Sequence, residues 1–254
     1  MKKIISALAF GAILASTSYA DLTRVAMGAG TWMQTPSGNA TYNATAGANG
    51  TDTLKQDQKT DPYVWLLIKH PIPVIPNIRL EYSTVEATGN PTGQWGAIST
   101  SIIPISGTSS KLDLTQYDII PYYSLLDNTL WMTLDVGLDL KMTDVDYKAN
   151  ATGSFIGYEN KQSMVIPMVY LRARVQIPTT KIGIEGDVKA ITNGTSKFYD
   201  VRAKIDYTFD FVPIIQPAVE VGYRRENINI DESSADIKTN ITFSGFFAGV
   251  MLRF

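Results

Sequence analysis

The sequence predicts an all-β fold, an antiparallel up-and-down β-barrel that crosses a membrane with about ten strands. Long segments alternate between apolar and polar side chains, and this period of two is that of a β-strand. Beyond residue 20, no run approaches the roughly 18 apolar residues that a membrane helix needs. The chain also ends on an apolar alternating segment, which would be an aggregation-prone edge in a soluble protein. A closed barrel has no free edge and satisfies its backbone hydrogen bonds in hydrocarbon.

Residues 1–20 have the three parts of a cleavable secretory signal peptide. Residues 1–3 carry two lysines, residues 4–15 are apolar, and residues 18–20 form a small-x-small cleavage site. The apolar stretch is too short to span a bilayer. We therefore expect cleavage after Ala20, which leaves residues 21–254 as a single barrel domain.

Composition excludes several classes of function. The chain has 22 Lys and Arg against 24 Asp and Glu, and cleavage would remove Lys2 and Lys3. The mature chain is then mildly acidic, so it offers no basic surface to nucleic acid. It contains no cysteine, which excludes disulfides and thiolate metal sites.

The clearest strand runs from Leu130 to Met142. Leucine, methionine and valine occupy one face, whereas the other face carries Asp135, Asp139 and Lys141. Thirteen residues exceed the usual soluble strand of about 5–6 and suit a tilted membrane crossing.

Nine further segments show the same alternation. In 110–119 the apolar positions change phase, which predicts a β-bulge there. In chain order the nine are 22–34, 62–69, 77–86, 110–119, 164–175, 181–192, 198–211, 217–224 and 245–254. We predict ten strands, with eight or twelve as the neighbouring possibilities, and a soluble β-sandwich is the alternative fold.

The connections fall into two kinds, as in membrane barrels, where short turns at one side alternate with longer loops at the other. An even number of strands puts both termini on the side of the short turns. The short, proline-rich connections are 70–76, 121–128, 178–180 and 212–216. The long, polar ones are 34–60, 87–109, 146–160 and 227–238. The tight-turn sequence 193–195 is the one short exception.

The polar faces of these strands form the main charged cluster. In a barrel of about ten strands they would project into a narrow lumen, which side chains can fill. Seven acidic and eight basic residues nearly balance, counting Lys181 and Asp200 with the thirteen below. We expect a lumen charge network of Asp135, Asp139, Lys141, Arg172, Arg174, Glu185, Asp187, Lys189, Arg202, Lys204, Asp206, Glu220 and Arg224. Such a network would neutralise buried charge, and a selective conduit for small polar solutes is the alternative.

The C-terminus carries Gly249, Leu252 and Phe254 in a Gly-x-x-apolar-x-aromatic pattern. This pattern, the signal peptide and the alternation resemble small integral outer-membrane β-barrel proteins of Gram-negative bacteria. The stretch 117–141 is also similar to an uncharacterised family of such barrels. The resemblance implies a location in the outer membrane and a C-terminal insertion signature read by the barrel assembly machinery. One departure is Phe247, where the family pattern often has a polar residue.

The resemblance implies no particular activity, so the predicted role is structural or a surface interaction through the loops. A narrow channel or transporter for small polar or hydrophobic solutes is the alternative. We expect no enzyme activity, because the chain has one histidine, His70, in a short turn without an obvious Ser or Asp partner. No metal spacing or cofactor is evident. The expected partners are outer-membrane lipid and a surface ligand bound through the loops, and we expect a monomer. The apolar segment Ile102–Ile105 either folds over the barrel rim or extends a strand, or it contacts lipid, a hydrophobic solute or a host surface.

Overall fold

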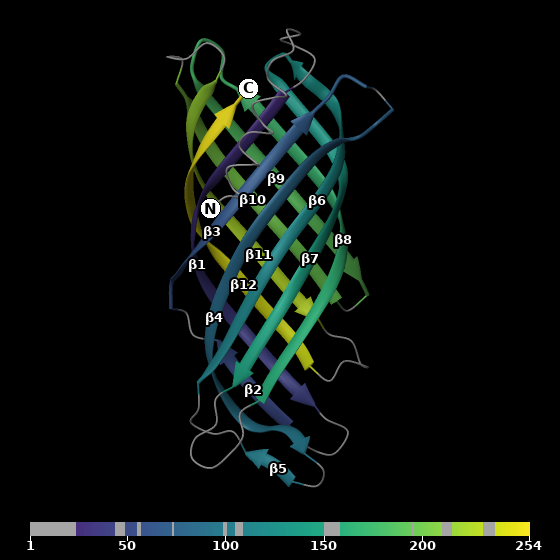
Figure 1. The fold of residues 1–254 in the computed structure, drawn as a ribbon, viewed down its shortest axis with the longest axis vertical. Coiled ribbons are helices and arrows are strands. Elements are labelled where there is room, and N and C mark those ends of the chain that lie inside the picture. Colours follow the sequence, from purple (N-terminus) through teal and green to yellow (C-terminus); the bar gives the residue numbers. More distant parts are fainter. Residues whose placement is uncertain are drawn as a thin grey trace, which may run out of the picture.

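The computed structural model describes residues 24–43, 49–54, 57–72, 74–98, 101–104, 109–149, 158–194, 196–209, 215–230 and 237–254. They form one closed antiparallel barrel (Figure 1). The predicted signal peptide lies outside the described residues. The strands are β1 (Arg24–Asn43), β2 (Asn49–Leu54), β3 (Lys59–Lys69), β4 (Asn77–Ile98), β5 (Ser101–Pro104), β6 (Ser110–Thr129), β7 (Met132–Ala149), β8 (Tyr158–Gln176), β9 (Ile182–Asn193), β10 (Ser196–Thr208), β11 (Gln216–Ile230) and β12 (Ile237–Arg253).

These twelve segments fill ten positions in the barrel wall. Strands β2 and β3 both lie between β1 and β4, one pairing with the far half of β1 and the other with its first half. They therefore count as one interrupted strand. Strand β5 pairs only with β4 and lies outside the ring. The prediction of ten strands is confirmed.

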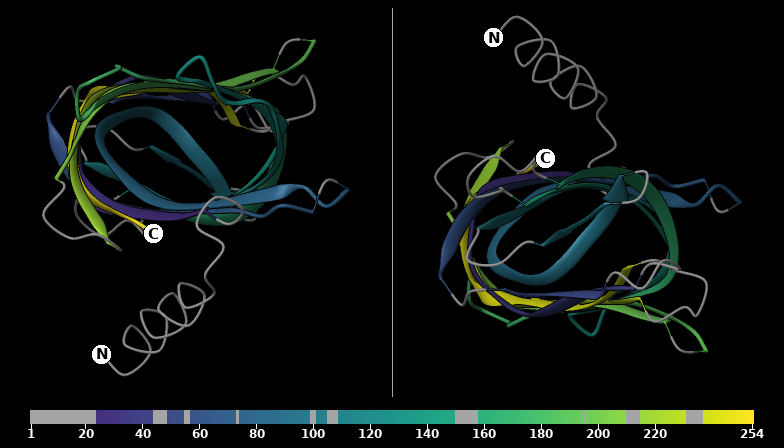
Figure 2. Two further views of the ribbon diagram at one scale, coloured as in Figure 1. Left: turned by 90° about the horizontal axis from the view of Figure 1, so that it is seen from above. Right: turned by 90° about the horizontal axis from the view of Figure 1, so that it is seen from below.

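The barrel closes between the first and last strands. Strand β1 pairs with β12 from Ala26 opposite Arg253 to Tyr42 opposite Ile237. The amide of Phe254 donates to the carbonyl of Val25 at 2.9 Å. Figure 2 shows the resulting ring along its axis, with the far part of β4 curving inside its outline in both views. The wall has no free edge, as the fold prediction required.

Both described chain ends, at Arg24 and Phe254, lie at one end of the barrel together with the turns that follow β3, β6, β8 and β10. We call this the terminal end, at the top of Figure 1, and the opposite one the loop end. The turn at residues 193–195 joins β9 to β10 at the loop end, with Gly194 at a φ of +60°. The connections therefore alternate between the two ends of the barrel, as predicted, and both described chain ends lie on the side of the short turns.

Two predictions about β6 are wrong. Residues 121–128 belong to the strand, and the turn is made by Leu130 and Trp131, both with positive φ. Pro121 cannot donate to the ladder, and the pairing with β7 omits Ile120 and Pro121 while the register stays the same. Residues 110–119 contain no bulge, because one inward face simply changes from Leu114 to polar Gln116 and Asp118. The register shifts come later, after Ser124.

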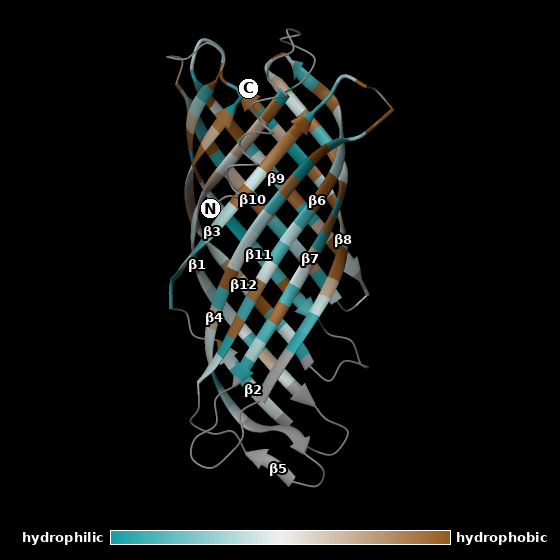
Figure 3. Ribbon diagram, viewed as in Figure 1, coloured by the Kyte–Doolittle hydropathy of each residue, from teal (hydrophilic) through white to brown (hydrophobic). Residues whose placement is uncertain are grey.

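A belt of apolar side chains surrounds the outside of the barrel. On β7 the outward residues from Met132 to Met142 are apolar, and Leu138 is 59% exposed. The next outward residue, Asp144, is charged and exposed. At a tilt of about 45°, the apolar stretch rises about 23 Å along the barrel axis, close to the thickness of a membrane barrel's belt. Figure 3 shows apolar residues along the upper and middle parts of the strands.

Beyond the belt the strands continue further than predicted. Residues 87–98 continue β4, although we predicted a loop from 87 to 109, and β1 reaches Asn43. There the outward face no longer needs to be apolar, so the alternation that marks a membrane strand is lost. The backbone of Ile102 lies in β5, a strand extension, whereas Ile105 lies outside the described residues. No helix in the described part of the chain is long and apolar enough to span a membrane.

Candidate functional site: the barrel lumen

Lys189 lies at the centre of the lumen charge network and is 0% exposed. Its Nζ lies 2.6 Å from Asp118 and 2.7 Å from Glu81, both as hydrogen bonds. Asp200 and Asp139 lie 3.7 and 3.8 Å from the same atom. These four carboxylates come from β6, β4, β10 and β7, so one ammonium group joins opposite walls of the barrel. A buried charge requires such partners, because the cost of its desolvation is otherwise uncompensated.

Two arginines extend this network by paired hydrogen bonds. Arg202 donates to Asp187 at 2.8 and 3.0 Å and to Glu81 at 2.5 Å. Arg224 holds Asp200 through two parallel bonds of 3.0 and 2.8 Å. Such paired contacts use the planar fork of the guanidinium group and fix its orientation. The arginines therefore hold the lumen side chains in one arrangement.

A polar layer follows toward the loop end. Lys141 lies 3.3 Å from both Asp118 and Glu226. Gln116 donates to Glu226 at 2.6 Å and accepts a hydrogen bond from Ser83 at 3.1 Å. In this layer the neutral side chains of Gln116 and Ser83 join the ion pairs of Lys141.

The loop-end part of the lumen contains a layer of buried apolar side chains, next to the buried Asp52, which accepts hydrogen bonds from Ser110 and Tyr147. Trp32 is almost fully buried, and the guanidinium of Arg224 lies 4.5 Å from the centre of its ring. Phe243 is 0% exposed. Buried residues from β12 and from five other strands complete this apolar layer, namely Leu54, Val85, Ala87, Leu112, Leu114, Tyr147, Ile228 and Ile241. This layer and Lys189 are both buried inside the barrel.

The structure places all thirteen predicted lumen residues inside the barrel. Eleven of them are buried, and Arg174 and Arg202 are nearly so. Sequence reasoning missed Arg79, Glu81, Asp118, Glu226 and Arg253, which belong to the same network. Each of them either stands next to an outward apolar residue in the chain or continues the inward face of a predicted strand. Alternation alone could therefore have placed them in the lumen.

A pair of aromatic residues lies near the seam between β1 and β12. Tyr63 and Trp65 both donate to one oxygen of Glu220, at 2.8 and 3.1 Å. Phe247 meets the ring of Tyr63 edge-on, with 5.6 Å between their centres. Its apolar character, the departure from the family pattern, therefore has a packing role here. Of the C-terminal residues, Gly249 faces the lumen next to Tyr63.

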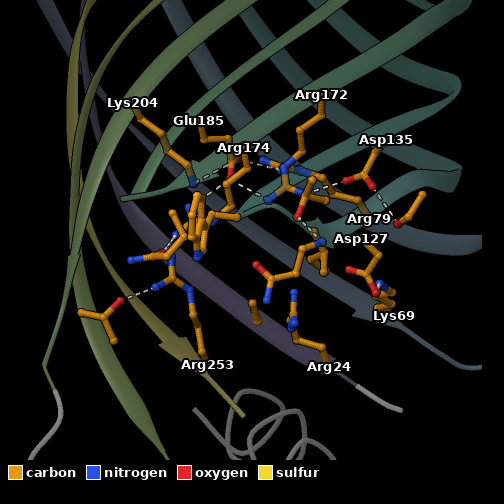
Figure 4. Close-up of a pocket in the computed structure, with 18 of the residues that line it drawn as sticks. Arg24, Lys69, Arg79, Asp127, Asp135, Arg172, Arg174, Glu185, Lys204 and Arg253 are labelled. Carbon is orange, nitrogen blue, oxygen red and sulfur yellow. Dashed lines mark hydrogen bonds and ion pairs between the residues drawn. The ribbon is translucent and has the colours of Figure 1, made fainter. Parts of the chain in front are cut away.

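A cavity of about 400 Å³ lies in the lumen at the terminal end, and we call it the terminal cavity. Its lining includes Arg24 and Lys69, at the terminal-end limits of β1 and β3, and Arg253 at that of β12. Figure 4 shows Arg24 and Arg253 on one side of this space and Arg172 on the other. The cavity is thus a recess in the terminal end, next to the lumen charge network.

His70 has a structural position in the turn between β3 and β4. Its Nδ1 accepts a hydrogen bond from the amide of Ile72 at 3.2 Å, and its Nε2 lies 3.1 Å from the carbonyl of Pro76. Both ring nitrogens are therefore used within the turn. In the part of the chain that the structure describes, no group of three or more His, Asp and Glu residues could hold a metal ion.

An apolar belt around a closed wall with a charged interior defines an integral membrane β-barrel. The fold is similar to that of the outer-membrane protease OmpT from Escherichia coli, at 12% identity over 94% of this chain and 99% of that chain, with a TM-score of 0.53. The translocator domain of the autotransporter NalP from Neisseria meningitidis shares 11% identity over 100% and 96% of the two chains, with a TM-score of 0.45. No family model and no curated protein matches the sequence. The chain therefore has the fold of the bacterial outer-membrane β-barrels.

Proposed function

We propose that this protein is a non-conducting outer-membrane barrel with a structural or surface-interaction role. The observation that carries the proposal is the burial of Lys189 among four carboxylates in the middle of the lumen. In a wide, water-filled pore such a side chain would be exposed, as in porins of sixteen or more strands. The apolar layer around Phe243 adds a second obstruction on the loop-end side.

Conductance in planar lipid bilayers tests this proposal. We expect the wild-type barrel to insert without stable conductance steps. A variant with Trp32→Ala, Arg224→Ala and Phe243→Ala should leak, because it shortens side chains in both obstructions. Heat-modifiable migration in gels would show that each variant is folded. Stable nanosiemens steps from the wild type would overturn the proposal and favour the alternative, a narrow channel for small solutes.

A role as an enzyme is not proposed, although OmpT is a protease. The likeness to OmpT concerns the fold alone. His70 is held by hydrogen bonds within a turn at the terminal end. Replacing His70 with Asn should leave the barrel folded and every surface activity unchanged.

The surface-interaction part of the role is assigned to the loop end. We propose that the segment Ile102–Ile105 contacts a ligand or a lipid outside the cell. Replacing Ile102, Ile103 and Ile105 with Ser should abolish binding while heat-modifiable migration is retained. Unchanged binding would rule out this segment. We further propose that the barrel acts as a monomer and that its partners are outer-membrane lipid and the barrel assembly machinery.

A further inference from the structure

The terminal cavity has an excess of basic side chains. Eight of its lining residues are basic and three are acidic. A recess with low-dielectric walls focuses the field of such charges and raises the local concentration of anions. The excess remains only if nearby carboxylates do not neutralise it, so each partner must be considered.

The carboxylates at the cavity are shared among several cations. Glu185 lies 2.6 Å from Arg172 and 3.4 Å from each of Arg79, Arg174 and Lys204. Arg79, Arg172 and Lys204 each contact a second carboxylate, namely Glu81 at 2.5 Å, Asp135 at 2.6 Å and Glu220 at 2.8 Å. Glu81 is itself shared with Lys189 and Arg202, so it does not neutralise Arg79 alone.

Asp206 is likewise shared, since it accepts hydrogen bonds from Arg174 at 3.0 Å and from Arg253 at 2.7 Å. Asp127, at the opposite side, pairs with Lys69. Arg24 has no ion pair within the described residues. These ion pairs join the lining cations to six carboxylates, namely Glu81, Asp127, Asp135, Glu185, Asp206 and Glu220, and several of the six are shared. The eight cations of the lining therefore outnumber these carboxylates, and Arg24 lies at the mouth of the cavity.

The size and the walls of the cavity suit a small ligand. Its volume of about 400 Å³ is within the range of small-molecule sites. Trp65, Leu67 and Tyr122 supply an apolar wall, and arginine forks bind carboxylate and phosphate groups through paired hydrogen bonds. The buried network around Lys189 closes the inner end, so a ligand would bind without passing through.

We propose that the terminal cavity binds a small multivalent oxyanion, a di- or tricarboxylate or a phosphate compound. The terminal end carries the short turns, which face the periplasm in outer-membrane barrels, so the ligand comes from that compartment. Carboxylates and phosphates share the chemistry that the arginines recognise. The proposal goes beyond the structural role above and does not depend on it.

Titration calorimetry of the full chain in nanodiscs of neutral phosphatidylcholine tests the site. The probes are citrate, succinate, inorganic phosphate and pyrophosphate at low ionic strength. We expect at least one probe to bind with one-to-one stoichiometry and to bind more weakly as salt screens the charges. The double variant Arg24→Gln/Lys181→Gln, at the mouth of the cavity, should weaken this binding about tenfold or more. The comparison of citrate with pyrophosphate shows whether carboxylate or phosphate is preferred.

Arg225→Gln is the matched control, because Arg225 is exposed and faces away from the lumen on β11. It should bind the same probe as tightly as the wild type. Thr133→Glu, which adds a carboxylate to the lining, should also weaken binding. Heat-modifiable migration checks the fold of each variant. Absence of binding by all four probes would overturn the proposed site. An equal loss of affinity in Arg225→Gln, or wild-type affinity in both cavity variants, would also overturn it.

Discussion

The indole N–H of Trp65 donates to Glu220 at 3.1 Å across the lumen, from β3 to β11. Strands β1 and β12 lie between these two in the wall, so the ring of Trp65 must extend over β1. Gly28 of β1 provides the space, because a Cβ there would lie 2.5 to 2.8 Å from three atoms of the ring. The hydrogen bond therefore depends on a glycine on a neighbouring strand.

We predict that Gly28→Ala lowers the free energy of unfolding by about 1–3 kcal/mol, the usual cost of overpacking a filled interior. Urea unfolding in lipid vesicles measures this change. Gly186→Ala is the control, since a Cβ at Gly186 would meet only the carbonyl of Arg202, at 3.6 Å. The control should be within about 0.5 kcal/mol of the wild type. Equal losses for both variants would show that the contact with Trp65 is unimportant.

Lys189→Met should destabilise the barrel strongly. The substitution preserves much of the side-chain length but leaves Glu81, Asp118 and the neighbouring carboxylates without their shared cation. Breaking a buried ion pair by removal of one partner costs about 3–5 kcal/mol, and unfolding in urea would measure it.

The control is Lys161→Met, at an exposed lysine 3.7 Å from Asp146. A surface pair contributes about 0–1 kcal/mol, so this variant should unfold like the wild type. If Lys189→Met were equally stable, the lumen would contain enough water or flexibility to replace the ammonium group.

The strands within the membrane could be predicted because the bilayer imposes their alternation. Outward residues such as Leu138 must be apolar, and inward residues such as Asp139 are free to be charged. Beyond the belt this constraint disappears, since Glu86 and Asp144 face water, and the prediction of strand ends failed there. The same reason explains why residues 121–128 were assigned to a turn: Pro121 is a turn signal that the barrel wall accommodates at a gap in the ladder.

The pairing inside the lumen could not be predicted from alternation. The period of two tells on which side of the wall Lys189 lies, but not that its partners come from β4 and β6. Those contacts depend on the closure of the barrel and on the register of all ten strand positions. The surplus of cations at the terminal cavity likewise depends on shared contacts, such as those of Asp206 with both Arg174 and Arg253, which alternation does not predict.

The apolar belt predicts where a charge is tolerated. Leu138→Arg places a guanidinium at the centre of the lipid-facing side of β7 and should cost about 2–4 kcal/mol. Asp144→Arg places an arginine on the same face of β7 but beyond the belt, so it should change the free energy of unfolding little. Unfolding in lipid vesicles compares the two. A similar cost at both positions would place the lipid boundary further toward the loop end.

We predict that the side chain of Phe254 contributes more to assembly of the barrel in cells than to the free energy of unfolding. The amide of Phe254 bonds to Val25 at the closing seam, and its backbone is kept in Phe254→Ala. The resemblance to outer-membrane barrels implies that the assembly machinery recognises the side chain, so this variant should fold more slowly in cells and accumulate less in the outer membrane. Its unfolding in vitro should be nearly unchanged.

Phe246→Ala is the matched control, because Phe246 lies on β12, the strand that Phe254 directly follows, and is an outward aromatic residue that is 62% exposed. It packs on Tyr223, with 5.3 Å between ring centres, and its loss should lower stability in vitro without delaying assembly. Pulse-chase measurement of the heat-modifiable form separates the two effects. If Phe254→Ala and Phe246→Ala delayed assembly equally, lipid-facing apolar area would matter and the terminal position would not.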